Sequence, residues 1–293
     1  MKELVTREER KEFIDKFDNF LFDCDGVLWE GTKLIPGVEK AMEELRSKGK
    51  NIYFVTNNST KSRKSFLKKL QDFGIQASLH EIFSSAFATA AYLKQVVHFP
   101  PEKKVYIVGM EGIRDELNAE GIRTCGAEED AHAVFDSEPI PDDPEVGAVV
   151  IGLDLHVNYT KYAKAFTYLK RNPGCRFILT NGDTTFPTHG MIVPGAGSIA
   201  MPIIKALNRE PEAVLGKPAQ NMLETIFAEY DLQPCKTVMI GDRLDTDIDF
   251  GNQGGIETLC VLTGITTKEE MLSPTNKIKP TYYIPSFSDL ASE

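Results

Sequence analysis

Two aspartates stand two positions apart at the end of an apolar run near the start of the chain. The run Phe20-Leu21-Phe22 is followed directly by Asp23-Cys24-Asp25-Gly26. Side chains alternate along a strand, so the carboxylates of residues 23 and 25 point to the same side, and a glycine allows a sharp turn after them. Two close carboxylates repel each other, which raises the proton affinity of one or recruits a cation. A plain turn cap is the structural alternative, because Asp and Gly are common in turns.

Phosphoryl transfer would give these two carboxylates different roles. An ionised Asp23 would attack phosphorus in line, and a protonated Asp25 would give its proton to the leaving oxygen and later activate the hydrolytic water.

Two further polar segments follow apolar runs. Thr56-Asn57-Asn58-Ser59 comes after Ile52–Val55 and offers hydroxyl and amide donors that suit phosphate oxygens, although helix capping would use the same residues. Gly216-Lys217-Pro218 comes after Val214-Leu215 and places a lysine ammonium on a loop, with the proline positioned to start a helix. A lysine there could also be an ordinary surface residue.

The densest carboxylate cluster follows a fourth run, Val238-Met239-Ile240. Its sequence is Gly241-Asp242-Arg243-Leu244-Asp245-Thr246-Asp247. Beside Asp23 and Asp25 these carboxylates would need neutralising, and oxygen ligands suit Mg²⁺. The alternative is a solvated acidic loop.

The elements that would position these residues alternate between short apolar strands and helical stretches, which predicts a parallel α/β sheet. The expected strands are 19–22, 51–55, 104–108, 148–151, 176–179, 213–215, 237–240 and 257–261. The expected helices are 37–48, 62–73, 159–170, 220–230 and 268–272. Loop-forming stretches at 99–103, 137–145 and 186–194 suggest an inserted domain. We therefore expect a Rossmann-like core at 1–99 and 191–293 and a smaller α/β insert at 100–190.

Composition narrows the class of partner. The 33 Lys and Arg against 43 Asp and Glu give a net charge of −10, which disfavours nucleic acid and anionic membranes. Five scattered cysteines without a C-x-x-C pair, and the lack of any run of 18 apolar residues, lead us to expect a soluble cytoplasmic protein. Cys24 has Glu30 six residues later, where a cysteine phosphatase loop needs arginine, so we expect it to pack behind the aspartates.

Taken together, the four polar segments resemble the motifs of the haloacid dehalogenase-like hydrolases. Their order and residues are similar to the branch that contains 4-nitrophenylphosphatases, phosphoglycolate phosphatases and pyridoxal phosphate phosphatases. The resemblance covers nearly the whole chain and implies a Mg²⁺-dependent phosphatase that acts on a small phosphorylated metabolite.

The same resemblance implies a role for each motif residue. Asp23 would be nucleophile and metal ligand, Asp25 the acid/base and a ligand through its carbonyl, and Asp242 the third protein ligand, with Asp247 behind them. Thr56 and Asn57, with Asn58, would hold phosphoryl oxygens, and Lys217 would orient Asp23.

The insert would be a substrate-selecting cap of the kind that this branch carries. Its stretch Thr180–His189 resembles the loop that reaches over the catalytic site, with Asn181 and Asp183 the better candidates for selectivity and His189 the weaker. Relatives are often dimers through the cap, which makes a homodimer an expectation by analogy. The alternatives are a pyridoxal phosphate or phosphoprotein phosphatase on the same scaffold, a phosphomutase, and a non-enzymatic phospho-receiver.

One further motif has a simpler reading. Gly195–Ala200 fits the dinucleotide pattern G-x-G-x-x-A, but the next strand ends in Gly216-Lys217 with no acidic residue for a ribose hydroxyl, so we expect a helix start.

Overall fold

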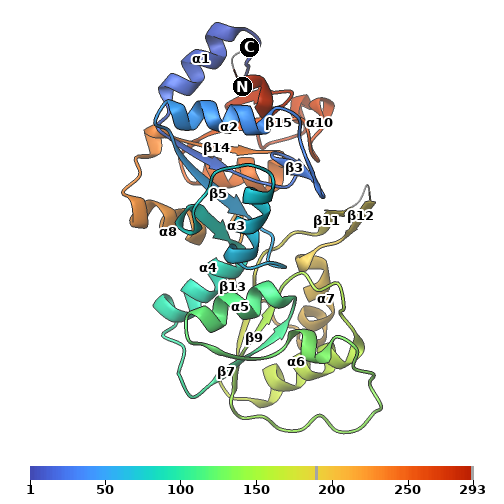
Figure 1. Cartoon of the computed structure of the whole chain (residues 1–293). Helices are drawn as coiled ribbons and strands as arrows, with labels where there is room; N and C mark the ends of the chain where they lie inside the picture. The colour runs from blue at the N-terminus through green and yellow to red at the C-terminus, as the bar shows by residue number, and fades with distance from the viewer. Residues whose placement is uncertain (189–190, 292–293) are drawn as a thin grey trace. The chain divides into compact units, whose positions relative to one another are not determined.

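The computed structural model describes residues 1–188 and 191–291, and the chain separates into two compact units (Figure 1). The first unit consists of Met1–Thr56, Leu67–Phe83 and Lys217–Glu293. The second unit consists of Asn57–Phe66 and Ser84–Gly216. Each unit is built on its own sheet, and each is described separately.

The first unit contains a seven-stranded sheet in the order β1-β16-β15-β14-β2-β5-β6. The strands from β1 to β5 in this order pair in parallel. Their bounds are β1 Lys2–Glu3, β2 Asn19–Phe22, β5 Asn51–Thr56, β6 Ile82–Ser84, β14 Thr237–Gly241, β15 Glu257–Val261 and β16 Tyr282–Ile284. All residues of β2 and β14 are buried, as expected for central parallel strands that are covered on both faces.

The helices of the first unit are α1 Arg7–Lys16, α2 Val38–Ser47, α3 Arg63–Asp72, α8 Asn221–Tyr230, α9 Asp249–Gln253 and α10 Lys268–Leu272. The first turn of α3 belongs to the second unit. Short 3₁₀ turns are η1 Leu79–Glu81, η4 Pro234–Lys236 and η6 Phe287–Leu290, and η5 Leu244–Ile248 is a π-helical turn. A small antiparallel pair, β3 Trp29–Glu30 and β4 Lys33–Leu34, follows the first motif.

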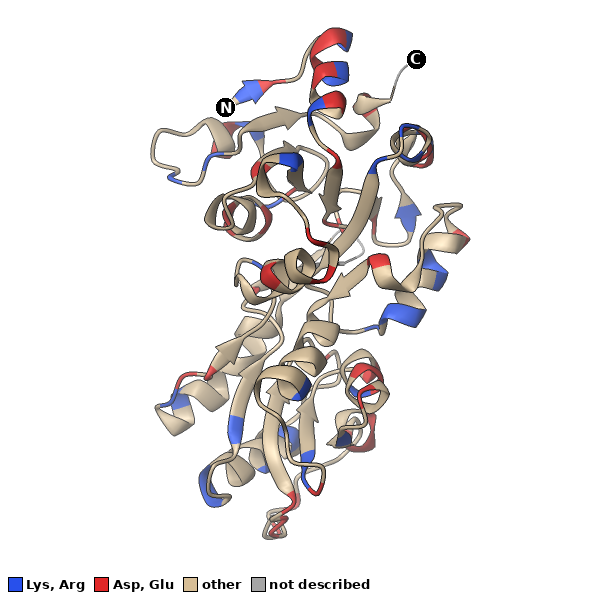
Figure 2. Ribbon diagram, turned by 90° about the vertical axis from the view of Figure 1, so that its left-hand side faces the viewer, with Lys and Arg blue, Asp and Glu red and all other residues tan. Residues whose placement is uncertain are grey.

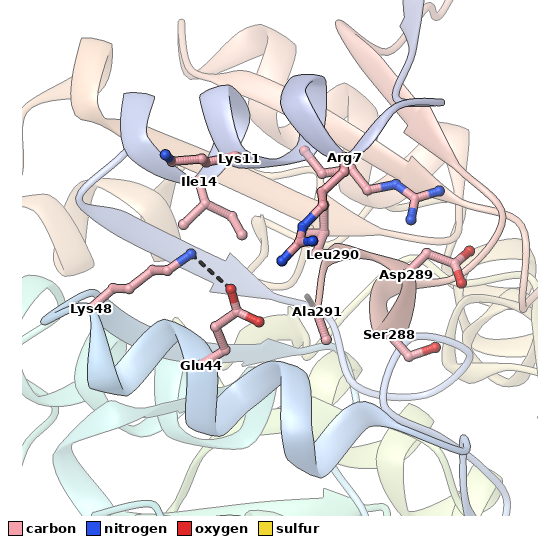
Figure 3. Close-up of a pocket in the computed structure, with 10 residues that line it drawn as sticks. Arg7, Lys11, Ile14, Glu44, Lys48, Ser288, Asp289, Leu290 and Ala291 are labelled. Atoms are coloured by element: carbon pink, nitrogen blue, oxygen red, sulfur yellow. Dashed lines mark hydrogen bonds and ion pairs between the residues drawn. The ribbon is translucent and has the colours of Figure 1, made fainter. Parts of the chain in front are cut away.

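A pocket of about 490 Å³ lies beside α1, α2 and η6 (Figure 3). Arg7 and Lys11 of α1, an ion pair of 2.7 Å between Lys48 and Glu44, and Asp289 of η6 contribute its charged groups. None of the residues that line it belongs to the predicted motifs.

The second unit contains a five-stranded sheet in the order β13-β10-β9-β7-β8, with every pair parallel. The strands are β7 Lys104–Val108, β8 Arg123–Gly126, β9 Val146–Ile151, β10 Arg176–Leu179 and β13 Ala213–Val214. Alternate residues of β7 enter two different hydrophobic clusters, with Tyr106 and Val108 in one and Val105 and Ile107 in the other. The sheet therefore has apolar packing on both faces.

The remaining elements described in the second unit are helices, short turns and an antiparallel strand pair. They are α4 Ser85–Ala91, α5 Glu111–Ala119, α6 Tyr159–Arg171, α7 Ala196–Leu207, η2 Tyr92–Val96, η3 Ala127–Asp130 and the antiparallel strands β11 Thr185–Thr188 and β12 Met191–Pro194. Gly195 directly precedes α7, which confirms the helix start expected at the G-x-G-x-x-A sequence.

The predicted fold class is confirmed, because both sheets are built from parallel strands that alternate with helices. All eight expected strands and all five expected helices are present within a few residues of their predicted limits. The second unit reaches beyond the predicted insert 100–190, because α4 precedes β7 within it and β13 pairs with β10. The role of this unit as a substrate-selecting cap stays a prediction.

The distribution of charged residues and the character of the helices complete the description. Lys and Arg (blue) and Asp and Glu (red) both occur along the ribbons of each unit (Figure 2). Among the residues that the structure describes, no helix combines the length and the apolar character that crossing a membrane requires.

Candidate active site

The ends of three neighbouring strands bring the first, second and fourth motifs to one edge of the first unit's sheet. The strands β14, β2 and β5 are adjacent and parallel, so their carboxyl ends meet at the same edge. Asp23 directly follows β2, Thr56 is the last residue of β5, and Asp242 directly follows β14. The backbone N–H of Asp23 donates to the carbonyl of Ile240 at 2.8 Å, which extends the pairing of β2 with β14 to the aspartate itself.

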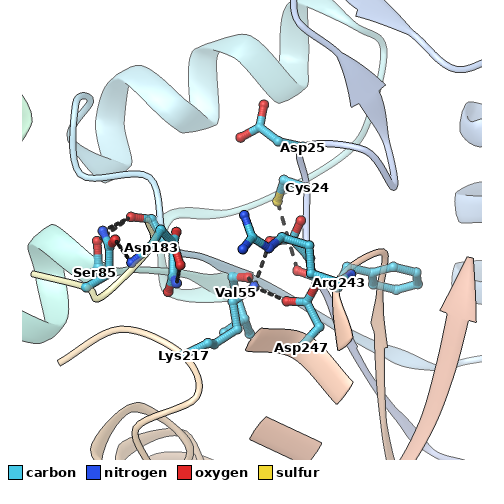
Figure 4. A network of polar contacts seen from close by, with 12 residues as sticks. Cys24, Asp25, Val55, Ser85, Asp183, Lys217, Arg243 and Asp247 are labelled. Atoms are coloured by element: carbon cyan, nitrogen blue, oxygen red, sulfur yellow. Dashed lines mark hydrogen bonds and ion pairs between the residues drawn. The ribbon is translucent and has the colours of Figure 1, made fainter. Parts of the chain in front are cut away.

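Lys217 connects these strand ends from a fourth segment. Its Nζ lies 2.6 Å from Asp23 Oδ1 and 2.7 Å from Asp247 Oδ1, and it donates to the carbonyl of Val55 at 2.6 Å (Figure 4). The side chains of Lys217, Asp23 and Asp247 are 1%, 12% and 2% exposed. The ion pairs are therefore shielded from water, so their Coulombic attraction is stronger than in surface pairs, and loss of one partner would leave a buried charge uncompensated.

Three buried carboxylates share this site. Asp23, Asp242 and Asp247 each offer an oxygen within 4.8 Å of the other two. Backbone N–H groups hold two of them, since Ile265 N–H donates to Asp242 Oδ2 at 2.7 Å and Arg243 N–H donates to Asp247 Oδ2 at 3.0 Å. These backbone hydrogen bonds help to hold Asp242 and Asp247 in the arrangement that brings the three carboxylates together.

Burial and mutual repulsion shift the acidity of the cluster. Burial, reinforced by the charge of Asp247, raises the pKa of Asp242 to about 7, against a lowering by the hydrogen bond from Ile265. Burial also raises the pKa of Asp23 well above its ordinary value, and Asp247 and Asp242 add to this, while Lys217 opposes it. Although burial lowers the pKa of the Lys217 ammonium, Asp23 and Asp247 raise it overall, so the lysine stays charged.

The charges of the cluster suit a divalent cation. One lysine ammonium faces three carboxylates, and like-charge repulsion favours a bound proton or cation in such a cluster. The donors are all hard oxygens, the ligand type that Mg²⁺ prefers. By its chemistry, the donor set fits a magnesium ion.

Asp25 is held separately from these three carboxylates. Its Oδ1 accepts a hydrogen bond of 2.8 Å from the indole N–H of Trp29, and Trp29 is fully buried. Asp25 itself is partly exposed. A buried donor thus orients the carboxylate of Asp25.

The remaining predicted residues form a second polar cluster, within the second unit. The side-chain N–H of Asn57 donates to Asp183 Oδ1 at 3.0 Å, and Asn181 Nδ2 donates to the backbone carbonyl of Asn57 at 2.8 Å. Asn58 Oδ1 accepts from both the backbone N–H and the hydroxyl of Thr60, at 2.9 and 2.7 Å. His189 lies outside the described residues.

Sequence reasoning gave no role to several groups that contact the predicted residues. Trp29 was part of the first motif without a function of its own, and its place four residues after Asp25 was the available signal. The carbonyl of Val55 and the N–H of Ile265 are backbone groups, which every residue type other than proline carries, so the sequence cannot indicate their role. Ser85 contacts Asn57 from the start of α4 and also had no signal in the sequence.

Known proteins with similar sequences and structures share this architecture. A haloacid dehalogenase-like hydrolase model matches residues 20–123, and a HAD-hydrolase-like model matches residues 214–290. A 4-nitrophenylphosphatase of Schizosaccharomyces pombe is 48% identical over 99% of this chain and 98% of its own length. Phosphoglycolate phosphatase 1A of Arabidopsis thaliana is 44% identical over 97% of this chain and 79% of its own length.

Solved structures agree with the sequence relatives. The p-nitrophenyl phosphatase from Archaeoglobus fulgidus is 30% identical with a TM-score of 0.80, covering 94% of this chain and 98% of that one. A glycerol phosphate phosphatase from Mycobacterium tuberculosis in complex with magnesium is 28% identical with a TM-score of 0.78, covering 96% and 78% of the two chains. The chain belongs to the haloacid dehalogenase-like hydrolases, in the branch of the 4-nitrophenylphosphatases and phosphoglycolate phosphatases, and is a phosphatase.

Proposed function

We propose that the protein is a Mg²⁺-dependent phosphomonoester hydrolase that works through an aspartyl-phosphate on Asp23. One observation carries the proposal: Lys217 binds Asp23 and Asp247 at the same strand edge where Asp242 completes a buried carboxylate cluster. Burying these charges costs stability, and clusters of this kind are found preferentially at functional sites. A metal-assisted nucleophile is the use that fits its charge and its donor atoms.

In the first step, a carboxylate oxygen of Asp23 forms a bond to phosphorus while the bond from phosphorus to the ester oxygen breaks. Lys217 supports this step by holding Asp23 Oδ1 at 2.6 Å and by countering its charge. Asp25, oriented by Trp29, gives its proton to the departing oxygen.

In the second step, water attacks the phosphorus of the aspartyl-phosphate. Asp25, now ionised, takes the proton of that water, and inorganic phosphate leaves as the carboxylate of Asp23 is restored. The same residue thus serves first as acid and then as base, which accounts for a pair of aspartates two positions apart.

The metal would be held by Asp23 and Asp242, with Asp25 contributing its carbonyl as the family resemblance implies. Asp247 is close enough to join or to support this set. When bound, Mg²⁺ would neutralise charge between the carboxylates and the phosphoryl group. The magnesium complex of the related glycerol phosphate phosphatase supports this assignment.

We assign phosphoryl binding to Thr56, Asn57 and Asn58, which follow one another in sequence. For the substrate we favour a small phosphorylated metabolite such as 2-phosphoglycolate, supported by the phosphoglycolate phosphatase relative. Pyridoxal phosphate and phosphoproteins are the alternatives on the same scaffold. Cytoplasmic location and a homodimer through residues 100–190 stay predictions from composition and family resemblance.

The test is hydrolysis of 4-nitrophenyl phosphate with and without Mg²⁺. Activity should be lost on chelation and in Asp23→Asn, which keeps the size of the side chain but removes the nucleophile. Asp245→Asn is the matched control, because Asp245 is an exposed aspartate, with 65% of its side chain accessible, on the same acidic loop. Undiminished turnover in Asp23→Asn refutes the nucleophile assignment.

Two further measurements separate the rival functions. Hydrolysis in ¹⁸O-labelled water places label in the released phosphate, whereas a phosphomutase would pass the phosphoryl group to a second sugar hydroxyl without labelling it. A phospho-receiver would instead accumulate a long-lived phosphorylated protein.

A further inference from the structure

Both the main chain and the side chain of Asn57 form hydrogen bonds with side chains of the second unit. Ser85 Oγ donates to the backbone carbonyl of Asn57 at 2.6 Å, and Asn181 Nδ2 donates to the same oxygen at 2.8 Å. The side-chain amide of Asn57 donates in turn to Asp183 Oδ1 at 3.0 Å. Main chain and side chain of this residue are therefore held by three different residues.

The residues that hold Asn57 are themselves fixed. Ser85 is fully buried and Asn181 is 3% exposed, and Thr89 Oγ1 donates to the carbonyl of Ser85 at 2.7 Å. The carbonyl of Asp183 accepts from the N–H of Gly197 in α7, at 2.9 Å. Because the partners are ordered by their own contacts, their hydrogen bonds impose a position on Asn57 rather than adapting to it.

Planarity of the peptide group carries this constraint to the next residue. In a trans peptide the C=O of one residue and the N–H of the following residue point in opposite directions within one plane. Two donors on the carbonyl of Asn57 therefore also fix the direction of the Asn58 N–H. Both residues belong to the segment to which phosphoryl binding is assigned.

We propose that Ser85, Asn181 and Asp183 are positioning residues that hold the Asn57–Asn58 peptide in the orientation that binds the phosphoryl group. The inference rests on the proposed function. It changes the expected role of Asn181 and Asp183, which the resemblance to the family suggested as selectivity residues, and it adds Ser85. A selectivity residue would discriminate between the organic parts of substrates, whereas a positioning residue acts on the phosphoryl group that all substrates share.

Matched variants separate these two roles. Ser85→Ala removes one donor to Asn57, and Ser84→Ala is its neighbour control, because Ser84 Oγ caps α4 by accepting from Phe87 N–H without contacting Asn57. Asp183→Asn retains an oxygen that can accept from Asn57, whereas Asp183→Ala does not. Melting temperatures of all four variants show the cost to folding.

The readouts are KM and kcat for 4-nitrophenyl phosphate and 2-phosphoglycolate, and the inhibition constant of inorganic phosphate. We expect Ser85→Ala and Asp183→Ala to raise both KM values and the phosphate inhibition constant by about tenfold, as loss of one hydrogen bond to an anion-binding segment would. The ratio of kcat/KM between the two esters should stay within about twofold. Asp183→Asn should recover most of the loss, and Ser84→Ala should lower the melting temperature alone.

The inference is overturned if Ser85→Ala and Asp183→Ala leave phosphate inhibition unchanged, or if Asp183→Asn is as impaired as Asp183→Ala. A change of the ester ratio beyond about fivefold would return Asp183 to a selectivity role. Should Ser85→Ala not fold, the two Asp183 variants decide the question. A parent protein that hydrolyses neither ester counts against the proposed function, whereas an active parent with unaffected variants counts against the positioning role only.

Discussion

Lys217 Nζ lies 2.6 Å from Asp23 Oδ1, although the two residues are 194 positions apart in the chain. Lys217 is the first residue of the last segment of the first unit, which follows the second unit in the chain. The contact therefore links this last segment to the first motif. Lys217 is also bound to Asp247 and to the carbonyl of Val55, so a single ammonium connects three strand-end segments. The position of Asp23 therefore depends on a residue that no local sequence pattern connects to it.

Replacing Lys217 by methionine should damage both stability and activity. The variant leaves Asp23 and Asp247 buried without their cation, and breaking a buried ion pair by removing one partner costs about 3–5 kcal/mol. Turnover of 4-nitrophenyl phosphate should fall by at least about 100-fold, since Asp23 loses both its orientation and its charge partner. Chemical denaturation in the presence of EDTA and steady-state kinetics in Mg²⁺ measure the two effects.

A second substitution provides the control for this variant. Asp247→Asn in the Lys217→Met background removes one of the two orphaned charges, so part of the lost stability should return while activity stays low. Equal stability of the single and double variants would mean that repulsion between buried carboxylates is not what Lys217 relieves.

Metal-free protein should lose stability as the pH rises from about 4 to about 7. Burial raises the pKa of Asp242 from 3.8 to about 7 in the folded chain, so between these values the folded state binds a proton that the unfolded state has released. The unfolding free energy then falls with rising pH, on the order of a few kcal/mol for a shift of this size, and the raised pKa of Asp23 acts in the same direction. Denaturation in EDTA at several pH values measures the slope.

Asp242→Asn isolates this contribution, because the amide cannot titrate. The difference in unfolding free energy between parent and variant should follow the predicted slope in EDTA and should shrink when Mg²⁺ is added. A pH-independent difference in EDTA would show that Asp242 is ionised throughout this range.

The sequence was sufficient for the central strands and for most of the catalytic candidates. Runs such as Phe20–Phe22 and Val238–Ile240 are buried on both faces and end in charged residues, a contrast that residue type alone reveals. Because parallel strands share one edge for their carboxyl ends, the meeting of Asp23 with Asp242 could also be expected.

Other features were not predicted, either because their sequence signal is weak or because they depend on long-range contacts. The helix α1 has a weakly apolar face with Phe13 and Ile14 as its buried residues, and its main signal was the capping box formed by Thr6 and Glu9. The contact of Asp183 with Asn57 joins residues 126 positions apart through a side-chain amide. No periodicity encodes such a pair, since it depends on how the whole second unit packs.

Replacing Trp29 by phenylalanine should impair protonation of the leaving group. The variant keeps an aromatic ring but removes the N–H that holds Asp25 Oδ1 at 2.8 Å. Esters with a poor leaving group, such as 2-phosphoglycolate, need the acid more than 4-nitrophenyl phosphate does, so their kcat should fall about tenfold further. Asp25→Asn should show the same preference more strongly, and an equal loss on both esters would argue against Trp29 as the residue that orients the acid.

Replacing Gly264 by alanine should weaken metal binding by displacing the carboxylate of Asp242, without replacing any candidate ligand. A Cβ atom at this position would overlap with Asp242 Oδ2, so the carboxylate must move. Its movement would also disturb the hydrogen bond from Ile265 N–H, and losses of this kind typically cost about 10- to 100-fold in metal affinity. The Mg²⁺ concentration for half-maximal activity should rise accordingly, while activity at saturating Mg²⁺ recovers in part.

Gly255→Ala separates this effect from a general loss of stability. Gly255 has φ +68° and open space around its Cβ position, so alanine there adds backbone strain of about 1 kcal/mol without approaching Asp242. Its Mg²⁺ dependence should match that of the parent even if its melting temperature is lower. An unchanged Mg²⁺ dependence in Gly264→Ala would place the metal away from Asp242 and would remove this residue from the ligand set.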